Sequence, residues 1–148
     1  MIHDGFNPFA AIRFHVPETF KDTLTKYTVT AASLGDESIF NRQMDCFLFS
    51  AAIGAREETW IDNDKLSDGL HGFADGNVLK LPEVEFLYLI ALQKDESNYE
   101  VIQDPSRIVK IAEGYAAHGI RRLDEMIGKG SLDPVSNLSR GIKKLLKG

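Results

Sequence analysis

The residues best suited to chemistry form an acidic segment in the middle of the chain. Asp62, Asp64 and Asp68 lie close together and are followed by His71, and closely spaced carboxylates suit a hard divalent cation. The spacing of a calcium loop is not met, because with Asp64 at position 1 the third position is occupied by Leu66 instead of an oxygen ligand. A solvated, turn-forming loop is therefore the better interpretation. A metal-dependent hydrolase or nuclease that uses the three aspartates and His71 stays open as an alternative.

The other candidates for catalysis do not form a recognisable set. No two of the four histidines stand four residues apart, which is the spacing of a zinc site on a helix. Glu113, Tyr115 and His118 fall within two turns of one helix, and we interpret them as a core tyrosine flanked by polar groups at the surface. The sequence contains no nucleophile elbow, phosphate-binding loop or dinucleotide-binding glycine motif. It therefore assigns no catalytic residue, metal ligand or cofactor, and it favours a protein that is not an enzyme.

The strongest charge pattern lies in residues 128–148, which predict a basic amphipathic helix. Four cations recur there at helical spacing: Arg140, Lys143, Lys144 and Lys147. Apolar residues occupy the opposite face: Val135, Leu138, Ile142 and Leu145. Such a helix can pack its apolar side on the protein and present the basic side to an acidic protein surface or a nucleic acid. The pattern is also explained by lysines that only aid solubility and complement the helix dipole.

A second candidate surface surrounds Trp60, the only tryptophan. It lies in a polar, glycine-rich segment from Ala55 to Leu81 that we interpret as a long irregular connection, with a small strand pair around residues 59–61 and 78–81. Connections of this length are unusual in compact domains, which makes a functional surface one explanation. Trp60 then either anchors a partner or fixes the loop to the core.

The elements that carry these residues are predicted to be helices. A short helix starts near Pro17, and the broad apolar face from Ile39 to Ala52 predicts a longer one, capped by Asp36 or Ser38 and ending at Gly54.

Three further helices are expected in the second half of the chain. Phe86–Leu92 is apolar on every face and predicts a central helix, whereas Asp104-Pro105 and Asp133-Pro134 are cap pairs that start two more. The first of these two ends at Gly128 or Gly130. The fold prediction is a mainly α, single-domain bundle of about five helices over residues 1–148, centred on the helices around Phe47 and Leu89.

Composition is that of a globular protein, with 43% hydrophobic and 26% charged residues. The longest apolar run is seven residues, far below the roughly 20 needed to cross a bilayer, and we expect a cytoplasmic protein that does not bind membranes. The net charge of −5 is uneven, because residues 128–148 carry five basic side chains and one acidic side chain. Most of the surface should therefore repel a polyanion, and only the C-terminal segment can attract one.

Two parts of the sequence resemble a known family. Arg42–Gly54 resembles the "K-D-x-F-x-x-A-A-x-G" helix of small accessory proteins associated with bacterial DNA phosphorothioation (Dnd-type) defence systems. Phe86–Leu92 and Ile111–Ile120 are similar to the later "I-A-L … A-E-E-Y-A-N-G-G" region, with Gly114 where the family tends to carry a glutamate. The similarity covers about residues 13–127.

This resemblance implies a noncatalytic component of a multi-protein anti-phage defence or DNA-modification system. We therefore expect an interaction subunit that binds other protein subunits of such a complex, with five contact residues: Trp60, Arg140, Lys143, Lys144 and Lys147. A DNA-binding module that uses the basic C-terminal helix is the first alternative, and the metal-dependent enzyme is the second. Self-association of the chain is left open.

Overall fold

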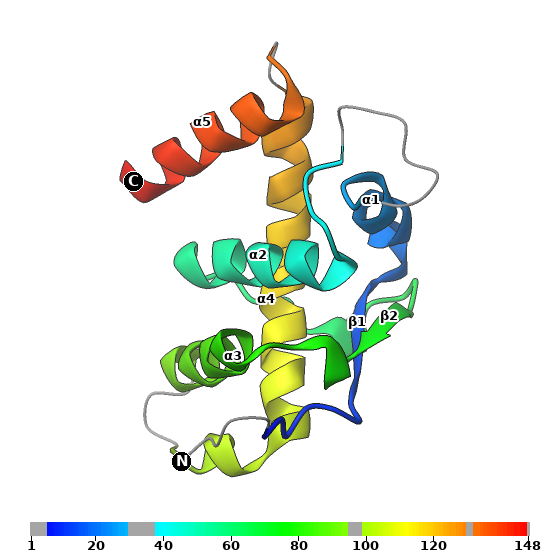
Figure 1. Ribbon diagram of the computed structural model, residues 1–148, viewed down its shortest axis with the longest axis vertical. Helices are drawn as coiled ribbons and strands as arrows, with labels where there is room; N and C mark the ends of the chain where they lie inside the picture. The colour runs from blue at the N-terminus through cyan, green and yellow to red at the C-terminus, as the bar shows by residue number, and fades with distance from the viewer. Residues whose placement is uncertain (1–5, 30–37, 95–98, 130–131, 148) are drawn as a thin grey trace.

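The computed structural model, shown in Figure 1, describes residues 6–29, 38–94, 99–129 and 132–147. These residues form five α-helices, several short 3-10 helices (η) and one small antiparallel sheet, which confirms the predicted mainly α fold. The elements follow one another in the order β1 (Arg13–Pro17), η1 (Glu18–Phe20), α1 (Lys21–Lys26), α2 (Gln43–Arg56), η2 (Asn63–Lys65), β2 (Leu70–Asp75), η3 (Gly76–Val78), α3 (Leu81–Lys94), η4 (Tyr99–Gln103), α4 (Pro105–Gly128) and α5 (Pro134–Lys147).

Helix α4 forms the axis of the fold, and the other helices are arranged along it (Figure 1). It begins at the predicted cap, because the Asp104 carboxylate accepts a hydrogen bond of 3.2 Å from the backbone N–H of Arg107. It ends at Gly128, which was one of the two predicted ends. Every residue from Ile111 to Ile120 is buried, so the middle of this helix is surrounded by protein on all sides.

Helix α2 crosses α4 at very short range. A methyl group at Gly54 would overlap the carbonyl oxygen of Tyr115, and one at Gly119 would overlap the carbonyl oxygen of Ser50. The two glycines therefore allow the two helix backbones to touch. Phe47 of α2 is fully buried, which confirms that this helix is central.

The start of α2 differs from the prediction. The helix begins at Gln43, where the backbone N–H of Arg42 donates to the Asp45 carboxylate at 3.1 Å. Ser38 is therefore not the cap, because it lies five residues before the helix, and Asp36 lies outside the described residues.

The prediction that α3 is also central is wrong. Its buried residues form one face: Val84, Leu87, Ile90 and Ala91. Leu89, on the opposite face, is 65% exposed. A helix that is apolar all round does not show which side will be covered, and here α3 packs on the outside of the α2–α4 pair. The position expected for α3 is taken by α4, whose glycines and alanines permit closer packing.

The predicted strand pair is also misplaced. The segment between α2 and α3 is a long connection as expected, but its strand is β2, which pairs with β1 near the start of the chain. Arg13 lies opposite Asp75 and Pro17 lies opposite Leu70. Pro17 therefore ends a strand, and the helical turns expected there follow as η1 and α1. Strand β1 is only five residues long, and its partner strand β2 lies more than fifty residues further along the chain. The sequence pattern of β1 therefore could not identify the pairing.

Helix α5 begins at its predicted cap, since the Asp133 carboxylate accepts a hydrogen bond of 3.0 Å from the backbone N–H of Ser136. It projects from the C-terminal end of α4 and runs past one end of α2 (Figure 1). Leu138 is buried, but Val135 is 58% exposed, so the predicted apolar face is only partly covered. None of the helices in the described ranges is long and apolar enough to span a membrane.

Candidate functional site

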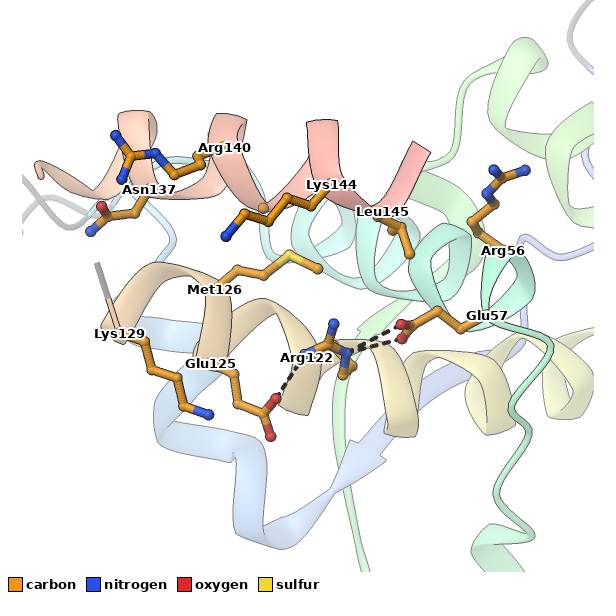
Figure 2. A pocket seen from close by; sticks show the side chains of 11 residues that line it. Arg56, Glu57, Arg122, Glu125, Met126, Lys129, Asn137, Arg140, Lys144 and Leu145 are labelled. Atoms are coloured by element: carbon orange, nitrogen blue, oxygen red, sulfur yellow. Dashed lines mark hydrogen bonds and ion pairs between the residues drawn. The ribbon is translucent and has the colours of Figure 1, made fainter. Parts of the chain in front are cut away.

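A wide groove of about 860 Å³ lies between α5 and the C-terminal half of α4, and the end of α2 closes one side (Figure 2). The first turns of α5 are attached to the end of α4, and the rest of α5 diverges from α4. The space between the two helices forms the groove. Asn137 provides much of this attachment, since its buried side-chain amide donates to the carbonyl oxygens of Ile127 at 2.9 Å and Leu132 at 2.8 Å.

Cations line the α5 side and the outer end of the groove. Arg140 and Lys144 come from α5, and Lys129 follows α4. All three are exposed, and none of them forms an ion pair with any residue that the structure describes. Arg56, at the end of α2, donates a hydrogen bond of 3.2 Å to the carbonyl oxygen of Leu146 and so connects α2 to the last turn of α5.

The opposite wall carries a hydrogen-bonded network centred on Glu57. Its carboxylate accepts from Nε2 of His118 at 2.8 Å and from Nε of Arg122 at 3.1 Å. Arg122 also pairs with Glu125 at 2.8 Å, and Arg121 contacts Nδ1 of His118 at 3.3 Å. Donation by Arg121 to Nδ1 leaves the proton of a neutral His118 on Nε2, where it can donate to Glu57.

This network changes the acidity of Glu57. Burial alone would raise the pKa of the Glu57 carboxyl, but the hydrogen bonds from His118 and Arg122 outweigh burial and hold the pKa below its ordinary value. Glu57 is therefore an anion at neutral pH. The groove presents unpaired cations on one wall and two carboxylates, Glu57 and Glu125, that are already bound to Arg122.

The sequence-based interpretation of Glu113 and His118 as surface groups is wrong. They are only 6% and 7% exposed, respectively. Glu113 accepts a hydrogen bond of 2.7 Å from the backbone N–H of His15, and its carboxylate lies 3.0 Å from Nδ1 of the same residue. The signal that could have shown this burial is the continuous run of apolar and small residues around both positions in α4.

The predicted contact residues do not gather in one place. Arg140 and Lys144 line the groove and also a second hollow on α5, beside Leu132 and Val135, whereas Lys143 and Lys147 line only that second hollow. Trp60 is remote from both hollows along α4: its indole N–H donates to the carbonyl oxygen of Ile111 at 3.1 Å. The basic helix and the tryptophan are thus separate surfaces.

The acidic segment is not assembled into a metal site. Asp62 accepts a hydrogen bond from the backbone N–H of Asp64 at 3.1 Å, and Asp64 lies 3.5 Å from Nζ of Lys110. His71 is part of β2 and Asp68 lies in the preceding turn. Throughout the ranges given above, no group of three or more His, Cys, Asp or Glu side chains is placed to hold a metal ion.

The fold and groove define a mainly helical protein that carries a mixed-charge groove beside its C-terminal helix. The family model for DNA sulphur modification system-associated protein 4 matches residues 13–144, and the chain belongs to this family. The match runs from β1 into α5 and includes Arg140 and Lys144. It confirms the resemblance to the accessory proteins of phosphorothioation systems. No curated protein and no solved structure matches the chain.

Proposed function

We propose that the protein is a noncatalytic interaction subunit of the DNA sulphur modification system with which its family is associated. In this proposal the groove between α4 and α5 binds an acidic surface of another protein subunit. The observation that carries the proposal is the pair of cations on α5, Arg140 and Lys144, which form no ion pair with any described residue although the protein has a net charge of −5.

The apolar surroundings of these cations support a protein partner. Leu145 lines the groove, Ile142 is half-buried next to it, and Leu146 is 63% exposed one residue further along. Protein interfaces combine an apolar centre with charged groups at the rim. The open side of α5 offers this combination, because its cations and its incompletely covered apolar residues alternate along the same four turns.

A nucleic acid is the second candidate partner, favoured by the continuous row of cations on α5. Two features weigh against it. A phosphate backbone in the groove would approach the carboxylates of Glu57 and Glu125, and most of the remaining surface is acidic. A protein partner can match positive and negative groups in the same groove, whereas a phosphate backbone is negative along its whole length.

The experiment compares two double variants of α5 with the same change in charge. Arg140→Glu with Lys144→Glu reverses the cations that line both the groove and the second hollow, and Lys143→Glu with Lys147→Glu reverses cations of the second hollow alone. Each is co-expressed with the other proteins of the modification system, and the complex is purified at two salt concentrations. We expect the groove variant to lose its partner and the second-hollow variant to keep it, and wild-type binding should weaken as salt rises.

A partner that stays bound to the groove variant would refute the proposed surface. Binding of a DNA duplex is measured in parallel by fluorescence anisotropy. Duplex binding that is lost in both variants and falls steeply with salt would favour the DNA-binding alternative instead. Circular dichroism of each variant verifies that the helices are intact.

A further inference from the structure

A second cavity, of about 520 Å³, lies along the N-terminal half of α4, away from the groove. Strand β1 and the loop after α2 form its walls, and Lys94 at the end of α3 reaches its rim. The cavity is within the size range of small-molecule sites and mixes apolar walls with a few polar groups. No residue of this cavity takes part in the function proposed above.

Two residues that line the cavity carry acceptors that bear on its ligand, Asn63 and Glu113. Oδ1 of Asn63 is buried and has no hydrogen-bond partner, while the amide nitrogen of the same side chain donates to the carbonyl oxygen of Glu113 at 3.2 Å. Glu113 is buried, and its Oε2 atom receives both contacts from His15, whereas Oε1 has no partner among the described residues. Among the described residues, Oδ1 of Asn63 is the only buried side-chain atom without a hydrogen-bond partner, and such an acceptor is unfavourable and indicates a missing water or ligand group.

An aromatic face stands beside these acceptors. Trp60 lies directly over Gly114, where any Cβ atom would overlap the indole, so the ring is held flat on α4. Nζ of Lys94 lies 4.9 Å from the centroid of the Trp60 ring. The tryptophan therefore already binds a cation, and this cation is on an exposed, flexible side chain that a ligand can displace.

Arg13 and Lys110 at the rim already have partners within the protein, so they do not favour an anionic ligand. Arg13 donates to the carbonyl oxygen of Gly72 at 3.0 Å and lies 3.4 Å from the Asp75 carboxylate, and Lys110 is paired with Asp64. Within the described part of the cavity lining, the buried atom that lacks a partner is an acceptor, Oδ1 of Asn63. Burial also raises the pKa of Glu113, although the hydrogen bonds from His15 act in the opposite direction, as expected for a carboxylate that lacks a full set of donors.

We propose that this cavity binds a guanidinium group, carried either by a free guanidino compound or by an arginine side chain. A guanidinium is planar and presents five N–H donors in fixed directions, so it can donate to the Glu113 carboxylate while its face lies against Trp60. It would take the place that Lys94 occupies on the indole. An ammonium group has no flat face to stack and should bind more weakly.

The test uses the fluorescence of Trp60, which reports directly on the cavity because it is the only tryptophan. The purified protein is titrated with ethylguanidine, with ethylammonium, with inorganic phosphate and with a capped tripeptide that has arginine at its centre. We expect saturable changes with ethylguanidine or the arginine peptide, and weaker binding of ethylammonium. Tighter binding of the peptide identifies a protein arginine as the source, and tighter binding of ethylguanidine identifies a free compound.

Two variants should raise the affinity for a guanidinium, a change that residues with only a structural role would not produce. Lys94→Ala removes the competing cation and should strengthen guanidinium binding about fivefold, whereas Lys80→Ala, an exposed lysine outside the cavity, should leave it unchanged. Asn63→Asp adds a negative charge beside Glu113 and should strengthen binding about tenfold, and circular dichroism verifies its fold because aspartate cannot donate to the Glu113 carbonyl oxygen. The proposal is overturned if neither guanidinium probe binds, if phosphate binds instead, or if Lys94→Ala weakens binding.

Discussion

Replacing Glu57 by glutamine should lower the free energy of unfolding by about 2 kcal/mol at neutral pH, because hydrogen bonds to charged groups contribute roughly 1.5–3 kcal/mol each. Glu57 accepts from His118 at 2.8 Å and from Arg122 at 3.1 Å, and its side chain is only 23% exposed. Glutamine keeps one acceptor, and Arg122 keeps its second partner Glu125. The loss should therefore be smaller than the roughly 3–6 kcal/mol that two such bonds would contribute together.

The effect should depend on pH with a defined sign. The pKa of Glu57 is held below its ordinary value in the folded protein. A carboxyl of this kind stabilises the fold at pH values above its unfolded pKa of about 4.3, and the stabilisation is lost as the pH falls through the folded pKa. The difference in unfolding free energy between wild type and Glu57→Gln should be present at neutral pH and shrink as the pH falls below about pH 4.

Urea denaturation followed by far-ultraviolet circular dichroism at several pH values measures this difference. Glu85→Gln is the control, because Glu85 is exposed on α3 and has no ion pair within the ranges described here. The reasoning would be refuted if Glu57→Gln behaved like Glu85→Gln at neutral pH. It would also be refuted if the two curves stayed parallel down to acid pH, since the network would then not involve an ionised carboxylate.

Three further predictions concern the core. Gly119→Ala should destabilise the protein by about 2 kcal/mol, because its methyl group would overlap the Ser50 carbonyl oxygen, whereas Gly128→Ala has open space; equal melting temperatures would contradict this contact. Leu48→Asp should cost about 4 kcal/mol in thermal denaturation, because Leu48 is only 9% exposed, and a variant with an unchanged melting temperature would show that the position is not part of the core. Burial raises the pKa of the Cys46 thiol to about 12, so native protein should not react with a disulfide reagent at about pH 8 until urea unfolds it, and fast reaction without urea would show that the thiol is accessible.

Local signals in the sequence predicted the helices that have strong caps. Asp104 and Asp133 each accept a hydrogen bond from a backbone N–H three residues further on, as the Asp-Pro pairs indicate. A cap depends on neighbouring residues alone, so the sequence contains all the information needed to recognise it. Phe47 was also placed correctly, because its helix has a broad apolar face on which it stands near the middle.

Long-range contacts explain the errors in the fold prediction. Leu89 is as hydrophobic as Phe47, and only the packing of α3 against α4 leaves it exposed. Strand β1 needs β2 as a partner, and five residues of alternation cannot identify a partner more than fifty positions away. Local hydrophobicity shows that a segment prefers a protein interior, but not which face will be covered.

The candidate sites, like the fold, depend partly on local sequence signals and partly on long-range contacts. The row of cations on α5 could be read from their spacing, but which of them also line the groove, Arg140 and Lys144, depends on where α4 lies. Nothing in the sequence connects Trp60 with Asn63, Glu113 and Lys94 in one cavity, because these residues come from a loop and two helices.

The amino-acid sequence by itself determined the helical composition, the capped helix starts, the basic face of the last helix and the family. Only the tertiary structure decided that α4 is the axis, that two of the four α5 cations line a groove and that Glu113 and His118 are buried. The physical reason is that caps, charge spacing and helix periodicity depend on residues a few positions apart. Burial and unpaired polar groups, by contrast, depend on which distant segments come together.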